Sequence, residues 1–263
     1  RRSPIAGAVV VLGAASLVLA ACGGSTSGDS SSAAPASSSA APSSSSAEPA
    51  PSTDCQNSQL KIGTLLPATG SLAYLGPPEY AGVDLAVSEI DAAGGVLGQP
   101  VVNEYGDSGD TETDIASQTV DSHLSKGVQV IIGAASSGVT FTVIDKITSN
   151  GVLQISPANT APSLTDYPDN GLYFRTAPSD SLQGAVQAAL AIDAGFSDGA
   201  TIARKDPYGE GLQNAFVADF EAGGGTITTS LTYDPTAATF DAEIAEIAAG
   251  NPQFVQVVGF DES

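Results

Sequence analysis

The sequence predicts an α/β protein with two lobes, each built on a parallel β-sheet flanked by helices. Short apolar runs typical of buried strands alternate with segments whose apolar residues recur every three or four positions. The alternation begins again in the second half of the chain. Parallel strands need long crossover connections, which helices usually supply, so this rhythm favours two helix-covered parallel sheets.

Residues 1–22 have the form of a bacterial export signal. Arg1 and Arg2 precede an apolar run from Ile5 to Ala21, which is near the lower length limit for crossing a bilayer. The run ends in the letters LAACG around Cys22, which resemble the lipobox of bacterial lipoproteins. That resemblance implies a lipid on Cys22 and attachment to the outer face of the cytoplasmic membrane. The alternatives are a plain signal peptide or a transmembrane helix that contains a cysteine.

Residues 23–58 are predicted to form a flexible tether. Up to Asp54, nearly every position is Ser, Ala, Pro or Gly, so this stretch cannot bury a core. An ordered Pro-rich recognition arm is the alternative. Cys55 would be the remaining cysteine if Cys22 carries lipid, and we expect it to pair outside this sequence or to be a free structural thiol.

Residues 59–177 are predicted to form the first lobe. The expected strands lie at 60–65, 101–105, 128–132, 152–156 and 173–176. Three helices with apolar packing faces are expected between the first four strands. Those faces carry Tyr80, Val83, Val87 and Ile90 on the first helix, Ala116, Val120 and Leu124 on the second, and Val139, Val143 and Ile147 on the third. Asp110 or Thr111 is expected to cap the second helix, and Ser136 or Ser137 the third.

Residues 178–263 are predicted to form the second lobe, joined to the first near 176–180. The expected strands lie at 200–203, 226–233 and 254–258. Three helices with apolar packing faces are again expected. These faces carry Leu182, Val186 and Leu190, then Leu212, Phe216 and Phe220, then Phe240, Ile244 and Ile247.

Special loops follow four of the predicted strands. They are small, polar or rich in glycine and lie at 133–138, 156–160, 205–211 and 259–263. In open parallel sheets, ligands bind beyond the carboxyl ends of the strands, beside helix N-termini. Two of these loops belong to each lobe, so a ligand held by all four would lie in a cleft between the lobes.

Composition excludes several classes of function. The chain of 263 residues has 8 Lys and Arg against 29 Asp and Glu, a net charge of 8 − 29 = −21, which argues against nucleic acid and a polybasic membrane contact. Two cysteines and one histidine cannot form a four-cysteine or Cys2His2 zinc site. The loop at 133–138 does not match the nucleophile elbow, and a single histidine in the sequence argues against a Ser-His-Asp enzyme. We therefore expect neither an enzyme nor a cofactor.

Four features have ordinary structural interpretations. The acidic stretch Asp107–Asp114 lacks EF-hand spacing, so a solvated loop is favoured over a metal site. His123 is expected to be structural, and Arg175 to form a structural ion pair. The Gly209-x-Gly211 pattern lacks a third glycine at Asn214, so it is not a dinucleotide fingerprint.

From Leu60 onward, a series of short motifs resembles the branched-chain amino-acid binding proteins of bacterial ABC uptake systems. No single motif is specific, but all occur in order behind the lipobox. The resemblance implies the type I periplasmic-binding fold. The motifs are Ile62-Gly63 with Pro67 and Gly70, the stretch 92–98 (AAGGVLG), Val130–Gly133 with Ser136 and Ser137, 155–160 (ISPANT), 174–176 (FRT) with Pro178, Asp180, Gln183 and Gly184, and 206–211 (DPYGEG).

The resemblance also implies a set of ligand contacts. Ser137 and Thr160, with Ser136 beside them, would hold the carboxylate of an amino acid, and the carbonyl of Ala158 would accept from its ammonium. Tyr208 corresponds to the tyrosine that closes the cleft. Two positions depart from the family: Phe260 replaces a second tyrosine, and Leu75, with Tyr74 beside it, replaces an aromatic residue.

The function that the resemblance implies is capture of a small amino acid between two lobes, with branched-chain amino acids as the leading ligands, and delivery to the membrane subunits of an ABC permease. We expect a lipid-anchored, extracytoplasmic monomer that binds no metal. Amides, urea or aromatic acids as ligands, and a sensor of the same fold, remain open. Family members continue well beyond Ser263, so the sequence is expected to be a fragment. The acidic partner of the ligand ammonium is expected in the missing part.

Overall fold

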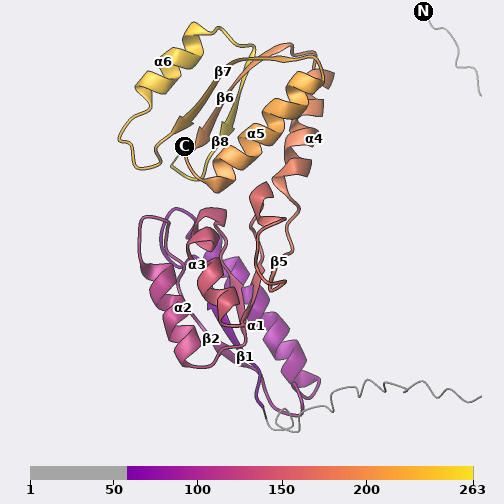
Figure 1. Ribbon diagram of the computed structural model, residues 1–263, viewed down its shortest axis with the longest axis vertical. Helices are drawn as coiled ribbons and strands as arrows, with labels where there is room; N and C mark the ends of the chain where they lie inside the picture. Colours follow the sequence, from indigo (N-terminus) through magenta and orange to yellow (C-terminus); the bar gives the residue numbers. More distant parts are fainter. Residues whose placement is uncertain (1–57, 263) are drawn as a thin grey trace, which may run out of the picture. The chain divides into compact units, whose positions relative to one another are not determined.

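The computed structural model describes residues 58–262 (Figure 1). The predicted export signal, lipidated Cys22, tether and Cys55 lie outside these residues, apart from the last position of the tether. Within the described part, eight strands alternate with helices. The elements are β1 (Lys61–Leu65), α1 (Gly76–Ala92), β2 (Val102–Glu104), α2 (Ile115–Ser125), β3 (Val130–Gly133), α3 (Ser137–Ser149), β4 (Leu153–Ser156), the 3₁₀ helix η2 (Pro162–Leu164), β5 (Tyr173–Arg175), α4 (Asp180–Asp193), β6 (Asp198–Arg204), α5 (Pro207–Ala222), β7 (Thr226–Tyr233), α6 (Asp241–Ala249) and β8 (Phe254–Val258).

The strands form two parallel sheets, as the α/β rhythm predicts. The first has the order β2-β1-β3-β4-β5 and the second β7-β6-β8, with every pairing parallel. In the first sheet, α1 lies on one face and α2 and α3 on the other (Figure 1). From β1 the chain crosses to β2 on one side of the sheet, and from β3 it crosses to β4 on the other side. The boundary between β1 and β3 is therefore the switch point, where ligands bind in such sheets.

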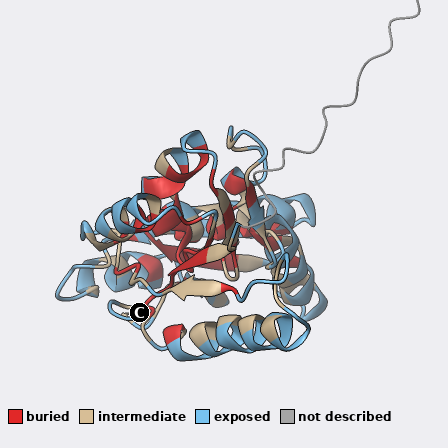
Figure 2. Ribbon diagram, turned by 90° about the horizontal axis from the view of Figure 1, so that it is seen from below, coloured by how far each residue is buried: buried red, intermediate tan, exposed pale blue. Residues whose placement is uncertain are grey.

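The core of the first lobe lies between the sheet and α2 and α3. Val120, Val143 and Ile147 are fully buried there against Leu65 and Ile131. Helix α1 is more exposed than predicted, because Gly76 is its one buried residue and Ile90 is 37% exposed. Figure 2 shows buried residues gathered on the strands, while the outward faces of the helices are exposed.

The cap predicted for α2 is wrong. The helix begins after Asp114, and no side chain caps its first turn. Asp110 instead accepts hydrogen bonds from the backbone N–H and the hydroxyl of Ser71, so the loop after β1 uses this carboxylate. The cap predicted for α3 is confirmed at Ser136, whose Oγ accepts from the N–H of Val139 at 3.3 Å.

Helix α4 packs through a different face from the one predicted. Leu182, Val186 and Leu190 are 60%, 50% and 63% exposed, whereas Gly184 and Ala188 are buried. The small residues let the backbones of α4 and α5 approach closely. A Cβ at Gly184 would lie 2.6 Å from the backbone nitrogen of Phe216. On α6, Ile247 is buried as predicted but Ile244 is 60% exposed.

Between residues 58 and 262, no helix combines the length and apolar character needed to cross a bilayer.

Candidate functional site

One cavity of about 220 Å³ brings together all eight residues predicted to contact a ligand. It lies where loops from both sheets meet beyond the carboxyl ends of the strands. The loop after β1 and helix α4 contribute the lining residues that do not come from the four predicted loops. The lining residues are Leu72, Tyr74, Leu75, Ala135, Ser136, Ser137, Ala158, Thr160, Gln183, Tyr208, Gly259 and Phe260.

The amino end of α3 forms the polar wall of the cavity. Ser136 caps the helix, and Ser137 is its first residue. The Oγ of Ser137 accepts from the backbone N–H groups of Thr160 and Ala161, each at 3.3 Å. These bonds use the lone pairs of the oxygen, so the hydroxyl can still donate. The positive end of the helix dipole and hydroxyl donors together suit an anionic group.

Buried hydrogen bonds hold the two loops of this wall together. Ser156 donates to the carbonyl of Ala134 at 2.7 Å and accepts from the N–H of Asn159 at 2.9 Å. Asn159 donates to the carbonyl of Ala135 at 2.8 Å and accepts from Thr140 at 2.6 Å. Ser156, Asn159 and Thr140 are fully buried, so the loops after β3 and β4 form a rigid, preorganised surface.

An aromatic pair forms the wall from the second sheet. The rings of Tyr208 and Phe260 stack with centroids 5.3 Å apart and an angle of 14°. Asp206 caps α5 by accepting from the N–H of Gly209 at 2.7 Å, which fixes the turn that carries Tyr208. Burial, with smaller contributions from Asp180 and Asp206, raises the pKa of Tyr208 to about 12, so its phenol stays neutral near pH 7.

The loop after β1 supplies the remaining apolar lining. Leu72 is 5% exposed, while Tyr74 is 61% exposed. The carboxylate of Asp107 accepts from the N–H groups of Ala68 and Thr69 at 2.9 and 3.2 Å. Asp107 and Asp110 therefore fix the loop after β1. The solvated loop predicted for Asp107–Asp114 did not include this structural role. No metal-ligand cluster of three or more acidic, His or Cys residues occurs among residues 58–262.

His123 and Arg175 lie away from the cavity lining. His123 is buried under Gly63, with Nε2 2.8 Å from the carbonyl oxygen of Thr64, as expected of a structural histidine. No ion pair of Arg175 occurs among residues 58–262. Its guanidinium donates instead to the carbonyl of Ala161 at 2.8 Å and the hydroxyl of Thr165 at 2.7 Å.

Four lining residues are not among the eight predicted contacts. Ala135 and Gly259 lie in the loops at 133–138 and 259–263 that were expected near the ligand. Leu72 was not predicted at all, and Gln183 was named only as part of a motif that carries the family resemblance. Asp180, the first residue of α4, is fully buried, and neither carboxylate oxygen makes a hydrogen bond of good geometry with a described residue. Burial raises the pKa of Asp180, and Thr160 and Arg175 offset part of that effect.

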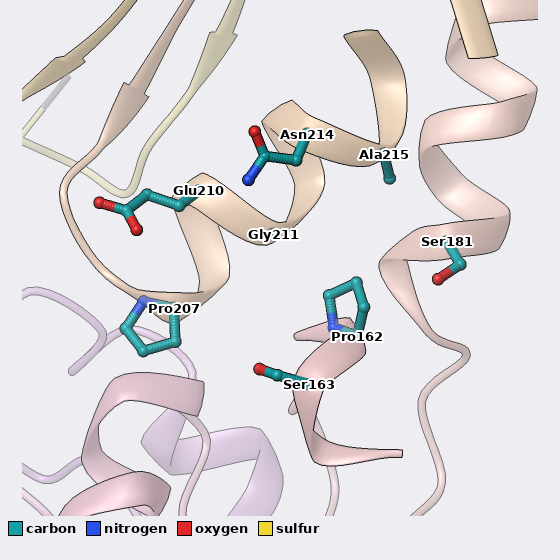
Figure 3. A pocket seen from close by; sticks show the side chains of 8 residues that line it. All are labelled: Pro162, Ser163, Ser181, Pro207, Glu210, Gly211, Asn214 and Ala215. Atoms are coloured by element: carbon teal, nitrogen blue, oxygen red, sulfur yellow. The ribbon is translucent and has the colours of Figure 1, made fainter. Parts of the chain in front are cut away.

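A second, more open cavity of about 580 Å³ lies between η2, α4 and the start of α5 (Figure 3). Its polar side chains are those of Ser163, Ser181, Glu210 and Asn214, all of which are exposed. None of the residues predicted to contact ligand lines it. We favour the smaller cavity as the candidate site because Ser136 and Ser137 in its wall are buried and held by hydrogen bonds, whereas the polar side chains of the larger cavity are exposed.

Comparison with known proteins supports the same fold. The periplasmic binding protein family model matches residues 59–262. The Leu/Ile/Val-binding protein BraC3 of Rhizobium johnstonii is 32% identical over 209 residues, which cover 78% of this chain and 55% of that protein. The chain thus spans about half the length of the curated relatives it matches.

Two solved structures are similar to most of the described part. An ABC transporter solute-binding protein of R. palustris, in complex with benzoate, has a TM-score of 0.66 and 27% identity, covering 76% of this chain and 55% of that one. An ABC transporter substrate-binding protein from Desulfitobacterium hafniense, in complex with Leu, has a TM-score of 0.60 and 25% identity, covering 76% and 58%. Both resemble this chain in fold over the part that they cover.

Proposed function

Because this chain belongs to the periplasmic binding protein family, we propose that it is a solute-binding protein that captures a small amino acid between its two lobes. Branched-chain amino acids are the leading ligands. The observation that carries the proposal is the convergence of all eight expected contact residues on one cavity of about 220 Å³. The names of its relatives, which are binding proteins, agree with capture without chemical turnover.

The ligand carboxylate would lie against the amino end of α3. The hydroxyls of Ser137 and Thr160 would donate to it, and the helix dipole would stabilise its charge. The carbonyl of Ala158 and the hydroxyl oxygen of Thr160 would accept from the ligand ammonium. A zwitterion removed from water needs partners for both charges, and this wall supplies them side by side.

The ligand side chain would lie between the two apolar walls. Leu72 and Leu75 face it from the first lobe, and the stacked pair of Tyr208 and Phe260 from the second. Such surfaces favour aliphatic side chains and discriminate only modestly between them, because each methylene contributes about 1–3 kcal/mol.

Delivery to an ABC permease, location outside the cytoplasm, the lipid on Cys22 and a monomeric state are part of the proposal. Closure of the two lobes around the ligand would create the surface that the permease reads. The lipid on Cys22 would keep the protein at the membrane, within reach of that permease.

A specific observation favours aromatic carboxylates as a second class of ligand. Tyr208 and Phe260 offer a flat stacked surface, and the side chains of the described lining residues include no carboxylate that would pair with an ammonium. The benzoate complex of the R. palustris relative supports testing this class.

Calorimetric titration of the full-length protein with leucine, isoleucine, valine and benzoate tests the proposal. The Ser137→Ala variant loses a hydrogen bond to a charged carboxylate, so we expect its affinity to fall about 10- to 100-fold. Ser163→Ala, at the larger cavity, is the matched control and should bind like the wild type. Undiminished binding by Ser137→Ala would contradict the proposed site. Absence of heat with all four ligands would contradict the proposed ligand classes.

A further inference from the structure

Behind the aromatic wall lies a buried arginine that does not line the cavity itself. Arg204, at the end of β6, is 5% exposed. Its Nε lies 2.7 Å from Oδ2 of Asp206, and its Nη1 lies 2.7 Å from Oε1 of Glu262. Its guanidinium carbon lies 3.9 Å from the centroid of the Phe260 ring. One planar group therefore contacts two carboxylates and an aromatic face.

These contacts connect the two segments that carry the aromatic wall. Asp206 caps α5, whose first turn holds Tyr208. Glu262 accepts from the hydroxyl of Tyr233 at 3.0 Å and from the backbone N–H of Phe260 at 3.4 Å. The guanidinium thus fixes the start of α5 and the loop after β8 relative to each other. These are the segments that bring Tyr208 and Phe260 into their stack.

We infer that Arg204 is a positioning residue that holds the Tyr208–Phe260 pair in place and thereby sets the affinity for the apolar part of the ligand. The inference rests on the proposed function. The Nε and Nη1 of Arg204 donate to different carboxylates, and the plane of the guanidinium contacts the ring of Phe260. A lysine ammonium is a point charge and cannot reproduce that arrangement.

Calorimetry and aromatic NMR on the full-length protein test the inference. Arg204→Lys keeps the charge without the planar fork, and Arg204→Met removes both. We expect both variants to bind leucine or benzoate about tenfold more weakly, because a displaced Tyr208–Phe260 pair would contact the apolar part of the ligand less closely. The ring resonances of Tyr208 and Phe260 should shift in the unliganded variants. Lys205→Met, which removes a neighbouring exposed charge, should change neither quantity.

Glu262→Gln provides a milder variant, because Arg204→Met leaves the buried carboxylate of Asp206 and the half-buried carboxylate of Glu262 without their cation. The amide oxygen of the glutamine can still accept from Arg204, so we expect a smaller loss of affinity and smaller ring shifts in the same direction. A series ordered wild type, Glu262→Gln, Arg204→Met in both measurements supports the inference.

Two results would overturn it. In the first, both Arg204 variants bind within about twofold of the wild type. In the second, affinity falls with a lowered melting temperature while the ring resonances of Tyr208 and Phe260 stay in place, which indicates general destabilisation. If the wild type binds no tested ligand, the proposed function fails. Ring shifts would then support the positioning of the aromatic pair by Arg204, and unshifted rings would overturn that as well.

Discussion

Glu79 shows how one buried carboxyl couples stability to pH. It lies in the first turn of α1, and its Oε2 is buried without a hydrogen-bond partner among residues 58–262. Burial raises the pKa of Glu79 from 4.5 to about 7. The folded state therefore holds this proton more tightly than the unfolded state. The resulting contribution to the free energy of unfolding is fully present below pH 4.5 and is lost as the pH rises to about 7.

Replacing Glu79 with glutamine should remove this dependence. We expect Glu79→Gln to raise the melting temperature relative to the wild type at pH 8 and to change it little at pH 4, because only the ionised carboxylate is penalised. Glu89→Gln, an exposed position on the same helix, is the control. Thermal unfolding across this range checks the prediction. An equal effect of Glu79→Gln at both pH values would contradict it.

At the scale of single residues, the sequence indicated most of the candidate site but not its support. Ser137, Thr160 and Tyr208 belong to recognisable loops after strands. Arg204 is not marked by any motif, and Asp180 appears only as part of a family motif without a role, because the importance of both comes from burial and from partners that the fold brings together. Arg204 and Glu262 are 58 positions apart in the chain, and no local pattern marks such a pair.

At the scale of elements, the contact between α4 and α5 depends on small residues. A Cβ on Gly184 would lie 2.6 Å from the nitrogen of Phe216 and 2.7 Å from the Cβ of Ala215. Apolar periodicity favoured the opposite face, since it gives most weight to large side chains such as Leu182 and Leu190. The close approach of two backbones is instead decided by the smallest side chains, which carry little periodic signal.

Alanine substitutions at two helical glycines should therefore have opposite effects. We expect Gly184→Ala to destabilise the protein by about 1–3 kcal/mol, because it overpacks the contact of α4 with α5. Gly82→Ala, on α1 with nothing within 4 Å of the new Cβ, should stabilise it by up to about 1 kcal/mol through helix propensity. Denaturant unfolding measures both. A stable Gly184→Ala protein would contradict the packing described for α4.

Strand positions were predicted better than helix faces. The strands β7 and β8 have the bounds expected from the sequence, at 226–233 and 254–258. Strand β6 is longer than expected and runs from Asp198 to Arg204. Runs of apolar and β-branched residues mark strands locally. The cap predicted for α2 was wrong because the carboxylate of Asp110 accepts instead from Ser71, 39 positions earlier in the chain.

At the scale of the whole molecule, two cavities compete for the role of ligand site. The smaller is enclosed by fixed, partly buried groups from both sheets, including Ser137 and Tyr208. The larger, between η2, α4 and α5, has exposed polar side chains such as Glu210 and Asn214. The resemblance of the sequence to amino-acid binding proteins selects residues of the smaller cavity. Volume alone would have selected the other.

The most direct test of the account is a crystal structure of the full-length protein with the tightest of leucine, isoleucine, valine and benzoate. We predict that the ligand carboxylate lies within hydrogen-bonding distance of the hydroxyls of Ser137 and Thr160. Its apolar part should contact the stacked pair of Tyr208 and Phe260. A ligand held against Pro162 and Asn214 in the larger cavity, with the smaller one unoccupied, would contradict the account.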